Sequence, residues 1–235
     1  MNLILLFPED FVEPHRARLA GRRLAHVRDT HRAAIGDALT VGLLAGPIGT
    51  GIVTRLDEDV LEMEVTLIQP PPPKLPLTLV LALPRPKVLN RVLASATSLG
   101  VRQIHLINAW KVEKSYWKSP RMAEENLMHQ RLLGLEQAKD TVLPELHLHR
   151  LFRPFVEDQL PGITQGTLAL VGHPGAVEPC PRQTEGPVTL AVGPEGGWIA
   201  SELESLTAVG FRPVDLGPRI LRTETAVAAL VGRLF

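Results

Sequence analysis

The chain has 235 residues, with 25 Lys and Arg against 25 Asp and Glu, so its formal net charge is zero. Hydrophobic residues make up 45% and charged residues 21%, which is typical of a globular protein with one large or two modest domains. The single cysteine, Cys180, excludes an intramolecular disulfide, and no cysteine cluster suggests zinc. Met1 to Phe7 is too short for a signal peptide, and no apolar run approaches the roughly 20 residues that span a membrane. We therefore expect a cytoplasmic protein without a metal site.

Positive charge is concentrated in two stretches of this neutral chain. Residues 16–32 hold six arginines against one acid, Asp29, and residues 85–121 hold eight cations against Glu113 alone. The balancing acids lie mostly elsewhere, so two basic surfaces are compatible with a net charge of zero. Such surfaces bind nucleic-acid phosphates, although solvated helix and loop faces have the same composition.

The first 69 residues are typical of a small β-barrel. Three runs rich in Val, Ile, Leu and Thr predict strands over Ala38–Leu44, Gly49–Leu56 and Val60–Ile68. In the third run, apolar residues from Leu61 onwards alternate with mostly polar ones, which is the period of a half-buried strand. We expect residues 16–32 to pack on the barrel as a short helix and loop.

Four consecutive prolines, Pro70 to Pro73, mark the clearest boundary in the chain. Proline is excluded from helix interiors and central strands and favours a stiff extended segment. We therefore predict a first domain over residues 1–69, a linker over residues 70–76 and a second domain over residues 77–235.

Beyond the linker, strand patterns alternate with helix patterns. Strands are predicted over Leu77–Leu83, Val101–Asn108, Thr167–Val171, Val188–Val192 and Pro213–Leu216. Helices are predicted over Lys87–Leu99, Ala123–Lys139, Leu151–Leu160, Ser201–Val209 and Thr223–Phe235. This alternation predicts an α/β fold with a parallel sheet and helices on both faces.

Three glycine-containing loops follow strands of that sheet, at the edge where ligands bind in α/β proteins. They are Gly172–Gly175, Gly193–Gly197 and Leu216–Ala226. Glycine permits a close approach of the backbone to a ligand. Neither of the first two loops matches the dinucleotide fingerprint or the phosphate-loop motif, so no cofactor of the NAD or ATP type is indicated.

The third loop combines the features of a pocket for a polar or anionic ligand. Gly217-Pro218 breaks regular structure, Arg219 and Arg222 bring two cations, and Thr223 is a suitable N-cap for the last helix. Backbone N–H groups at such a junction bind polar or anionic ligands. An ordinary strand-to-helix turn with charged decoration accounts for the same residues.

Single residues in the other two loops leave alternatives open. His173 fits an acid–base residue, a ligand contact or a turn histidine before proline. Glu195 fits a carboxylate at a helix N-terminus, and Trp198 fits a packing residue better than a base-stacking one. The loops therefore indicate a ligand site without assigning its chemistry.

The second and third loops together resemble the paired signature of a known family. Val192-Gly-Pro-Glu-Gly-Gly197 followed by Leu216-Gly-Pro-Arg-Ile-Leu-Arg-Thr-Glu-Thr-Ala226 is similar to the 16S rRNA uracil-N3 methyltransferases of the SPOUT, or trefoil-knot, class. The resemblance extends over the whole chain. It includes the start of a PUA-like barrel at Arg23–Arg28 and Gly36-Asp37, and catalytic-domain markers at Leu99–Val101, Glu136-Gln137 and Val142–Glu145.

The resemblance implies a deeply knotted carboxyl-terminal domain that binds S-adenosylmethionine, and a homodimer whose partner subunit completes the site. It also implies that backbone amides and the Ile220-Leu221 pair hold the adenine. The residues implied around the cofactor are His173, Gly193, Pro194, Glu195, Gly196, Gly197, Leu216, Gly217, Pro218, Ile220, Leu221, Arg222, Thr223 and Thr225. The candidates for RNA contact are Arg16, Arg22, Arg23, Arg28, Lys114 and Lys118.

Methyl transfer to uridine N3 needs placement, a cation and a proton acceptor. The cofactor's sulfonium already activates the methyl group, so positioning supplies much of the acceleration. Arg222 is the first candidate for orienting the uracil or stabilising its anion. Glu224 orients Arg222, handles the N3 proton or is a helix carboxylate without a catalytic role. N3 lies on the pairing edge, so the base must be unpaired or flipped out.

The chain departs from the family pattern outside the cofactor motifs. Ser98 stands where Lys and Glu residues commonly precede Leu-Gly-Val, and Asp140 lies where an arginine is usual. The segment Lys114–Lys118 keeps its charge and adds aromatic residues that can stack on bases. We therefore expect a methyltransferase of the small ribosomal subunit. The alternatives are the same chemistry on another RNA uridine, and a non-catalytic RNA-binding or ribosome-assembly factor.

Overall fold

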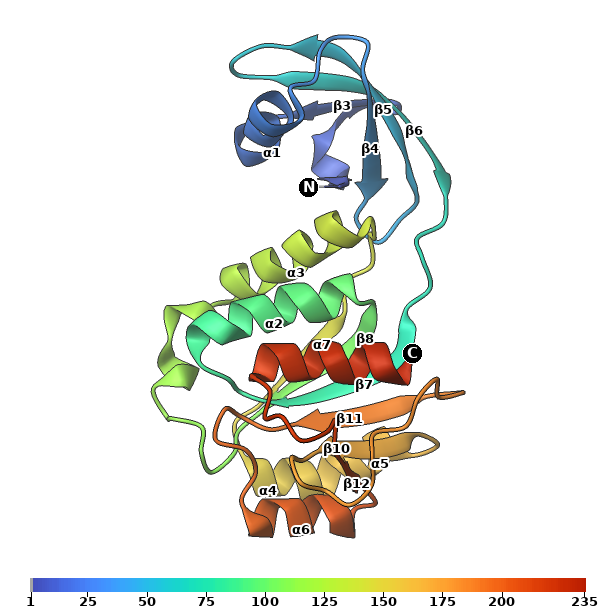
Figure 1. Cartoon of the computed structure of the whole chain (residues 1–235). Helices are drawn as coiled ribbons and strands as arrows, with labels where there is room; N and C mark the ends of the chain where they lie inside the picture. The colour runs from blue at the N-terminus through green and yellow to red at the C-terminus, as the bar shows by residue number, and fades with distance from the viewer. Residues whose placement is uncertain (1) are drawn as a thin grey trace. The chain divides into compact units, whose positions relative to one another are not determined.

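The computed structural model describes residues 2–235, which fall into two compact units (Figure 1). The first unit comprises the chain up to Pro73 together with Leu132–Leu143, and the second comprises Lys74–Arg131 and Pro144–Phe235. Helix α3 (Glu124–Ala138) therefore gives its first turns to the second unit and its last turns to the first. No helix within residues 2–235 is long and apolar enough to cross a bilayer.

The first unit is built on a curled six-stranded sheet in the order β1-β4-β5-β6-β3-β2. β1 and β4 are parallel, and the other neighbours are antiparallel. Because β1 and β2 remain as free edges, the sheet is a half-barrel, and the small barrel predicted from the sequence is confirmed in this open form. The strands are β1 (Ile4–Leu6), β2 (Phe11–Glu13), β3 (Arg16–Leu19), β4 (Ala38–Leu43), β5 (Ile48–Leu56) and β6 (Leu61–Gln69).

Alternation along the strands builds the core of the first unit. On β6, Leu61, Met63 and Val65 are buried, whereas Glu64 and Thr66 are exposed; Glu62, on the same face as these two, is covered by its ion pair with Arg18. Successive side chains of a strand point to opposite faces, so this pattern places one face of β6 in the core and the other in solvent. The strand prediction made from this alternation is confirmed.

Residues 16–32 differ from the helix and loop expected there. They begin with β3, which pairs antiparallel with β6, and its residues Ala17 and Leu19 are buried. In Arg16–Leu19, arginines alternate with Ala17 and Leu19, which is the period of a strand with its charged side chains towards solvent. The number of arginines in residues 16–32 drew attention to charge, and this short strand pattern was missed. The prediction was therefore wrong for the first four residues. The helical part follows as α1 (Gly21–His26) and the π-helical turn η2 (Val27–His31).

The second unit is built on a six-stranded sheet in the order β12-β10-β11-β7-β8-β9, and every pair of neighbours is parallel. The predicted α/β fold with a parallel sheet is confirmed. Its central strands read as continuous apolar runs because both faces of the sheet are covered. The strands are β7 (Leu75–Ala82), β8 (Val101–Ile107), β9 (Glu145–His149), β10 (Leu168–Gly172), β11 (Val188–Val192) and β12 (Arg212–Val214).

Helices cover both faces of this sheet. Helices α2 and α7 pack together on one face, and α4, α5 and α6 lie on the other (Figure 1). The longer helices are α2 (Pro86–Ser98), α6 (Ala200–Ala208) and α7 (Thr223–Leu234). The short ones are η3 (Tyr116–Lys118), η4 (Pro120–Met122), α4 (Phe152–Pro154), η5 (Phe155–Gln159) and α5 (Leu160–Thr164).

Two features of the sheet differ from the sequence prediction. β9 was not predicted, because three of its five residues, Glu145, His147 and His149, are polar. Within residues 2–235 it pairs with β8 alone, as an edge strand, and an edge strand needs fewer apolar side chains. β7 begins at Leu75, inside the segment assigned to the linker. Its register with β8 shifts before Thr78, where the intervening proline makes no ladder bond.

The connection between β10 and β11 is interlaced with the carboxyl-terminal segment. The N–H of Cys180 donates to the carbonyl of Asp215 at 2.8 Å, and the N–H of Asp215 donates to the carbonyl of Glu178 at 2.9 Å. Further along the connection, the N–H of Thr184 donates to the carbonyl of Leu234 at 2.7 Å. These bonds tie the loop after β10 to both ends of the last segment, close to the predicted ligand loops.

Candidate active site

A cavity of about 820 Å³ lies at the carboxyl ends of β10, β11 and β12. This is the edge at which open α/β sheets bind ligands, and the volume suits a small molecule or cofactor. The three loops singled out in the sequence meet here. The lining segments are Gly172–Pro174, Val192–Trp198, Val214–Leu216 and Arg219–Glu224, with Ala226 and Leu230 from α7 and Arg85, Val88 and Arg91 from the start of α2.

Most of the residues predicted around a cofactor therefore share one cavity. Three do not belong to its lining: Gly217, Pro218 and Thr225. The loop after β12 bends away at Gly217, where a φ of 121° is a conformation that favours glycine. The residues that line the cavity are His173, Gly193, Pro194, Glu195, Gly196, Gly197, Leu216, Ile220, Leu221, Arg222 and Thr223, together with Glu224.

The contribution of α2 to the cavity was missed from the sequence. Arg85 and Arg91 fall in the basic stretch 85–121, but only the fold brings them beside the loops after β11 and β12. The side chain of Glu195 connects these elements, since it accepts a hydrogen bond of 2.9 Å from the backbone N–H of Arg85. Glu195 thus fixes the second loop against the turn between β7 and α2, which is a more specific role than a helix-terminal carboxylate.

The second loop is also packed tightly against an aromatic ring. A Cβ on Gly193 would lie 3.2 Å from the indole nitrogen of Trp198. Trp198 is buried, and its Nε1 has no hydrogen-bond partner among the described residues. The sequence interpretation of Trp198 as a packing residue agrees with this burial. The absent side chain at Gly193 leaves the backbone accessible beside the ring, as a cradle for a ligand requires.

In the third loop, Glu224 does not pair with Arg222. Glu224 lies 3.1 Å from Arg91 of α2, and its side chain is 20% exposed. Arg222 is exposed and forms no ion pair within residues 2–235. Arg222, rather than Thr223, is the N-cap of α7, so the predicted capping role of Thr223 was wrong. Thr223 is the first helical residue and is buried.

The aromatic residues of Lys114–Lys118 are turned into the protein. Trp117 is buried, donates its Nε1–H to Asn108 at 3.0 Å and lies beneath the guanidinium of Arg150. Tyr116 is half-buried and donates to Glu113, and burial together with that carboxylate raises the pKa of its hydroxyl. The expectation that these rings stack on bases is wrong for Trp117, because its ring fills the core beside β8.

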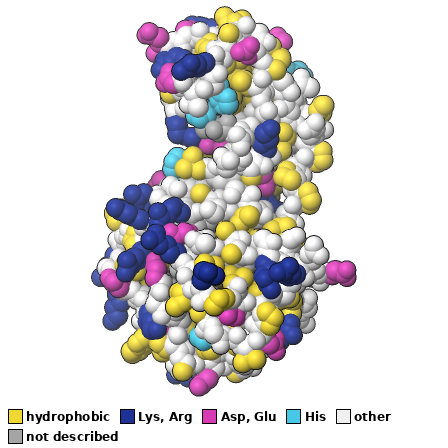
Figure 2. Space-filling view, viewed as in Figure 1, with side chains coloured by type: hydrophobic (Ala, Val, Ile, Leu, Met, Phe, Trp, Pro, Cys, Tyr) yellow, Lys and Arg dark blue, Asp and Glu magenta, His cyan; other side chains and the backbone are white. Residues whose placement is uncertain are grey.

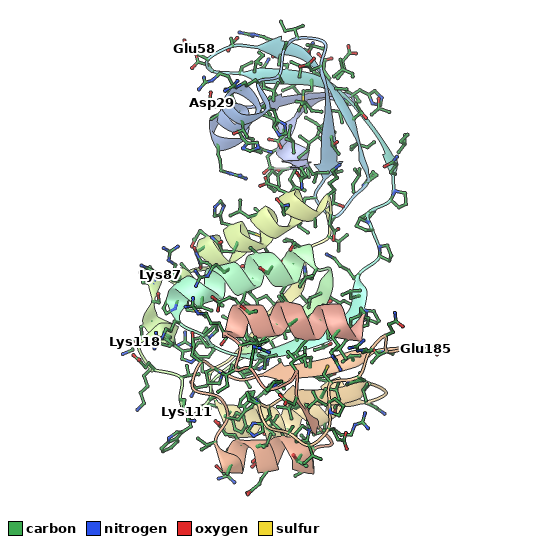
Figure 3. All side chains as sticks on the ribbon, in the orientation of Figure 1. Asp29, Glu58, Lys87, Lys111, Lys118 and Glu185 are labelled. Atoms are coloured by element: carbon green, nitrogen blue, oxygen red, sulfur yellow. The ribbon has the colours of Figure 1, made fainter. Side chains whose placement is uncertain are left out.

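A cationic surface adjoins the cavity. Figure 2 shows Lys and Arg side chains gathered on the side where α2 begins, and Figure 3 shows Lys87, Lys111 and Lys118 on that side. Arg102 belongs elsewhere, because it stands at the amino end of β8. Lys111 links the surface to the second loop through a hydrogen bond of 2.6 Å from its Nζ to the carbonyl of Gly196. The exposed members are Arg85, Lys87, Arg91, Lys111, Lys114, Lys118 and Arg121.

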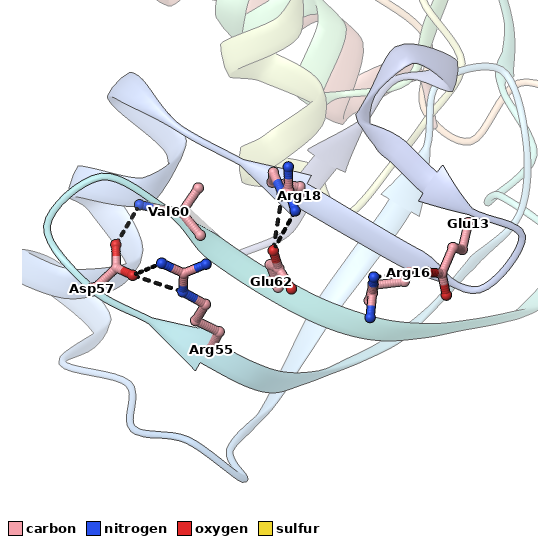
Figure 4. A network of polar contacts seen from close by, with 7 residues as sticks. All are labelled: Glu13, Arg16, Arg18, Arg55, Asp57, Val60 and Glu62. Carbon is pink, nitrogen blue, oxygen red and sulfur yellow. Dashed lines mark hydrogen bonds and ion pairs between the residues drawn. The ribbon is translucent and has the colours of Figure 1, made fainter.

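The arginines of the first unit are less free than their spacing indicated. Arg22 pairs with Glu136 at 2.8 Å and Arg28 pairs with Asp29 at 2.8 Å. Figure 4 shows Arg16 with Glu13 and Arg18 with Glu62, at 2.7 and 2.8 Å. The expected excess of charge over 16–32 is therefore largely neutralised. Glu62 and Glu136 are distant in sequence, so a count within the stretch could not include them.

Arg23 is the most enclosed of these arginines. Its guanidinium forms a two-pronged pair with the carboxylate of Asp10, including a contact of 2.7 Å, and donates to the carbonyl of Leu5 at 2.8 Å. It also lies over the ring of Phe7, 5.0 Å from the ring centre. The side chains of Arg23 and Asp10 are 18% and 8% exposed. These contacts describe an arginine that holds the start of the first unit together.

The fold and the site define an α/β domain whose parallel sheet carries a ligand cavity beside a cationic surface. Residues 71–234 match the RNA methyltransferase domain family. A ribosomal RNA small subunit methyltransferase E from Treponema pallidum is 33% identical over 237 residues, which cover 97% of this chain and 88% of that protein. The chain belongs to the ribosomal RNA small subunit methyltransferase E family. The resemblance found in the sequence is thereby confirmed.

Solved structures share the fold over nearly the whole chain. The ribosomal RNA small subunit methyltransferase E from Neisseria gonorrhoeae, bound to S-adenosyl methionine, superimposes with a TM-score of 0.75 at 23% identity, covering 98% of this chain and 95% of that one. A putative methyltransferase from Legionella pneumophila, in complex with the bound cofactor SAM, gives a TM-score of 0.74 at 22% identity, covering 98% and 96%. These similarities confirm the predicted fold class.

Proposed function

We propose that the protein transfers a methyl group from S-adenosylmethionine to N3 of a specific uridine in the 16S rRNA of the small ribosomal subunit. Family membership supports the reaction class. The observation that carries the proposal is the meeting of Gly193–Gly197 and Arg219–Thr223 in one cavity beside a cationic surface. A methyl donor and an RNA base must be brought together, and this edge of the sheet offers a place for each.

The cavity residues fit S-adenosylmethionine. Its volume of about 820 Å³ is within the range of cofactor sites. Gly193 leaves room beside Trp198 for an approach to backbone, and the half-buried Leu221 with the exposed Ile220 offers apolar surface for the adenine. Asp215, Glu195 and Glu224 bring carboxylates to the lining, which suits a ligand with cationic groups. The bound cofactor supplies an activated methyl group.

The chain's own residues orient the uracil and stabilise its charge. Arg222 lines the cavity and has no carboxylate partner within residues 2–235, so its N–H donors are available for uracil oxygens as N3 loses its proton. We assign Arg222 as the catalytic residue. Glu224 is held by Arg91, and we assign it a positioning role for the wall of the cavity in place of a contact with Arg222. His173 remains a candidate ligand contact.

RNA binding is proposed for both units. Lys114 and Lys118 are exposed on the cationic surface of the second unit and suit phosphate contacts. In the first unit, the PUA-like half-barrel presents Arg16, Arg22 and Arg28, which are about half exposed despite their pairs. Arg23 is not proposed to contact RNA, because its guanidinium donates to the carboxylate of Asp10 and the carbonyl of Leu5.

A homodimer is part of the proposal. Ile220 is 85% exposed although it lies in the lining of the cavity. A large apolar side chain at the rim of a site is more favourable when a second copy of the chain covers it. Sedimentation equilibrium tests this directly, and a monomer at micromolar concentration with full activity would contradict it.

The reaction is tested with small ribosomal subunits whose 16S rRNA lacks 3-methyluridine. Incubation with the protein and S-adenosylmethionine is expected to produce one 3-methyluridine, which mass spectrometry of nuclease fragments locates. A methylated nucleotide in another RNA would point to the same chemistry on a different substrate. A protein that binds subunits but has no affinity for S-adenosylmethionine by calorimetry would be an assembly factor, and the proposed reaction would be wrong.

A further inference from the structure

Trp110 is the only exposed Phe, Tyr or Trp side chain within residues 2–235, with 78% of its surface accessible. It follows β8, at the carboxyl edge of the sheet where the cavity also lies. We propose that Trp110 is a stacking platform for an unpaired base of the RNA substrate, next to the base that enters the cavity. This inference rests on the proposed function and adds the residue that holds the neighbouring nucleotide.

The backbone around Trp110 is held by hydrogen bonds and by buried neighbours, so the fold itself keeps the ring exposed. Ala109 and Val112 on either side are buried, and the N–H of Val112 donates to the carbonyl of Ala109 at 3.0 Å. The N–H of Trp110 donates to the carboxylate of Glu202 at 2.7 Å. Glu202 is itself buried and also accepts from the N–H of Ile199 at 3.1 Å. A tight turn anchored to α6 therefore projects the indole outward.

The next residue connects this turn to the cavity. The Nζ of Lys111 donates to the carbonyl of Gly196 at 2.6 Å, and a Cβ on Gly196 would lie 2.7 Å from Cδ of Lys111. The lysine stem therefore lies directly across Gly196, which lines the cavity. The exposed ring therefore belongs to the residue directly before a side chain that contacts the second loop at Gly196. This short separation suits two contacts that hold consecutive nucleotides.

The surroundings favour RNA over a protein partner. Exposed cations lie near Trp110 along the chain, at Lys111, Lys114 and Lys118, and Figure 3 shows Lys111 and Lys118 on the same side of the second unit. A protein interface core is depleted of lysine and presents contiguous apolar area, whereas an isolated tryptophan among cations is typical of single-stranded nucleic-acid binding. A base stacks on the indole while its phosphates meet the lysines.

The substitution Trp110→Ala tests this inference against Trp110→Phe, which keeps an aromatic face. With small subunits that lack 3-methyluridine, we expect Trp110→Ala to lower kcat/KM by roughly 5- to 100-fold, mainly through KM. Trp110→Phe should retain most of the wild-type value. The affinity for S-adenosylmethionine by calorimetry and the unfolding temperature should stay at wild-type values in both variants. Leu148→Ala removes a partly exposed apolar side chain from β9 and is the matched control.

A binding measurement separates this inference from the proposed reaction. A labelled single-stranded oligouridylate of about ten nucleotides should bind Trp110→Ala more weakly than the wild type and quench the fluorescence of wild-type Trp110. If the wild type does not methylate subunits but loses oligonucleotide affinity with Trp110→Ala, the reaction is wrong and the stacking role stands. If kcat/KM and oligonucleotide affinity of Trp110→Ala both equal the wild type, the stacking role is overturned.

Discussion

The carboxylate of Glu224 on α7 lies 3.1 Å from the guanidinium of Arg91 on α2, at the wall of the cavity. The pair joins the helix that follows the third ligand loop to the helix that follows β7. Because Arg91 is 60% exposed, the attraction is screened, and such pairs contribute at most about 1 kcal/mol to stability. The main effect of the contact is to orient the side chain of Glu224 towards Arg91. Glu224 therefore does not pair with Arg222.

The first prediction concerns Glu224. Glu224→Gln should lower kcat by less than about 10-fold and change the free energy of unfolding by less than about 1 kcal/mol, because only a partly exposed positioning contact is lost. Single-turnover methylation and urea unfolding measure the two quantities. Glu204→Gln, at an exposed position of α6, is the control. A loss of kcat as large as that of Arg222→Ala would instead assign the N3 proton to Glu224.

The second prediction concerns Arg222. Arg222→Ala should lower kcat by about 100- to 1000-fold, the usual effect of removing a donor to developing negative charge. The affinity for S-adenosylmethionine, measured by calorimetry, should change little because the loop backbone remains. Arg219→Ala is a matched control, since Arg219 is also exposed and also lines the cavity. Equal activity of the two alanine variants would remove Arg222 from the mechanism.

The third prediction concerns Gly193. A Cβ at this position would lie 3.2 Å from the buried Trp198, which has little room to move. Gly193→Ala should therefore shift the second loop and weaken S-adenosylmethionine binding by about 10-fold, a loss of about 1.4 kcal/mol. Gly162→Ala is the control, because a Cβ there meets nothing within 4 Å. Unchanged affinity in calorimetry would show that the loop does not approach the cofactor.

Most of the second unit could be predicted because its signals are local. The strand predicted over Val188–Val192 coincides with β11. A short apolar run between proline and glycine is too short for a helix and is typical of a buried strand. The second and third loops, which meet in the cavity, could be named because both motifs are continuous in sequence. The wall contributed by Arg85 and Arg91 could not be found in this way, because it depends on β7 and β11 being neighbours in the sheet.

The remaining errors arose where distant residues decide the outcome. Leu135 on α3 belongs to a core with Leu3 and Leu5 of the first unit, which a proline boundary at residues 70–73 does not reveal. Trp117 carries the same aromatic signal as Trp110, yet Asn108 and the core hold one ring inside while Glu202 anchors the turn that exposes the other. The charged and aromatic residues of a sequence segment can predict that it forms a binding surface. Which of its side chains are exposed there depends on burial, which only the fold shows.

The fourth prediction separates structure from RNA binding among the arginines. Arg23→Ala leaves the largely buried Asp10 without its partner and should destabilise the protein by about 3 kcal/mol or more. Arg28→Ala removes an exposed, solvent-screened pair, so its free energy of unfolding should match that of the wild type, while RNA binding weakens with a smaller dependence on salt. Chemical unfolding and RNA titrations at several salt concentrations measure these effects. Wild-type stability of Arg23→Ala would contradict the structural role.

The fifth prediction concerns pH and a buried histidine. Burial, with smaller contributions from His147 and His149, lowers the pKa of His105 to about 4, and Glu145 opposes this shift. The ring is hydrogen-bonded through Nδ1 to Nε2 of His149 at 3.0 Å, and burial also lowers the pKa of His149.

The unfolded chain takes up a proton at this position near pH 6.5, whereas the folded state resists it until about pH 4. Stability from the neutral ring is therefore present above pH 6.5 and lost as the pH falls towards 4, by up to ~3 kcal/mol. His105→Gln should flatten the dependence of the unfolding free energy on pH in this window, while His129→Gln, at an exposed position of α3, should not. Urea unfolding between pH 4 and 7.5 measures both, and equal slopes for wild type and His105→Gln would refute the assignment.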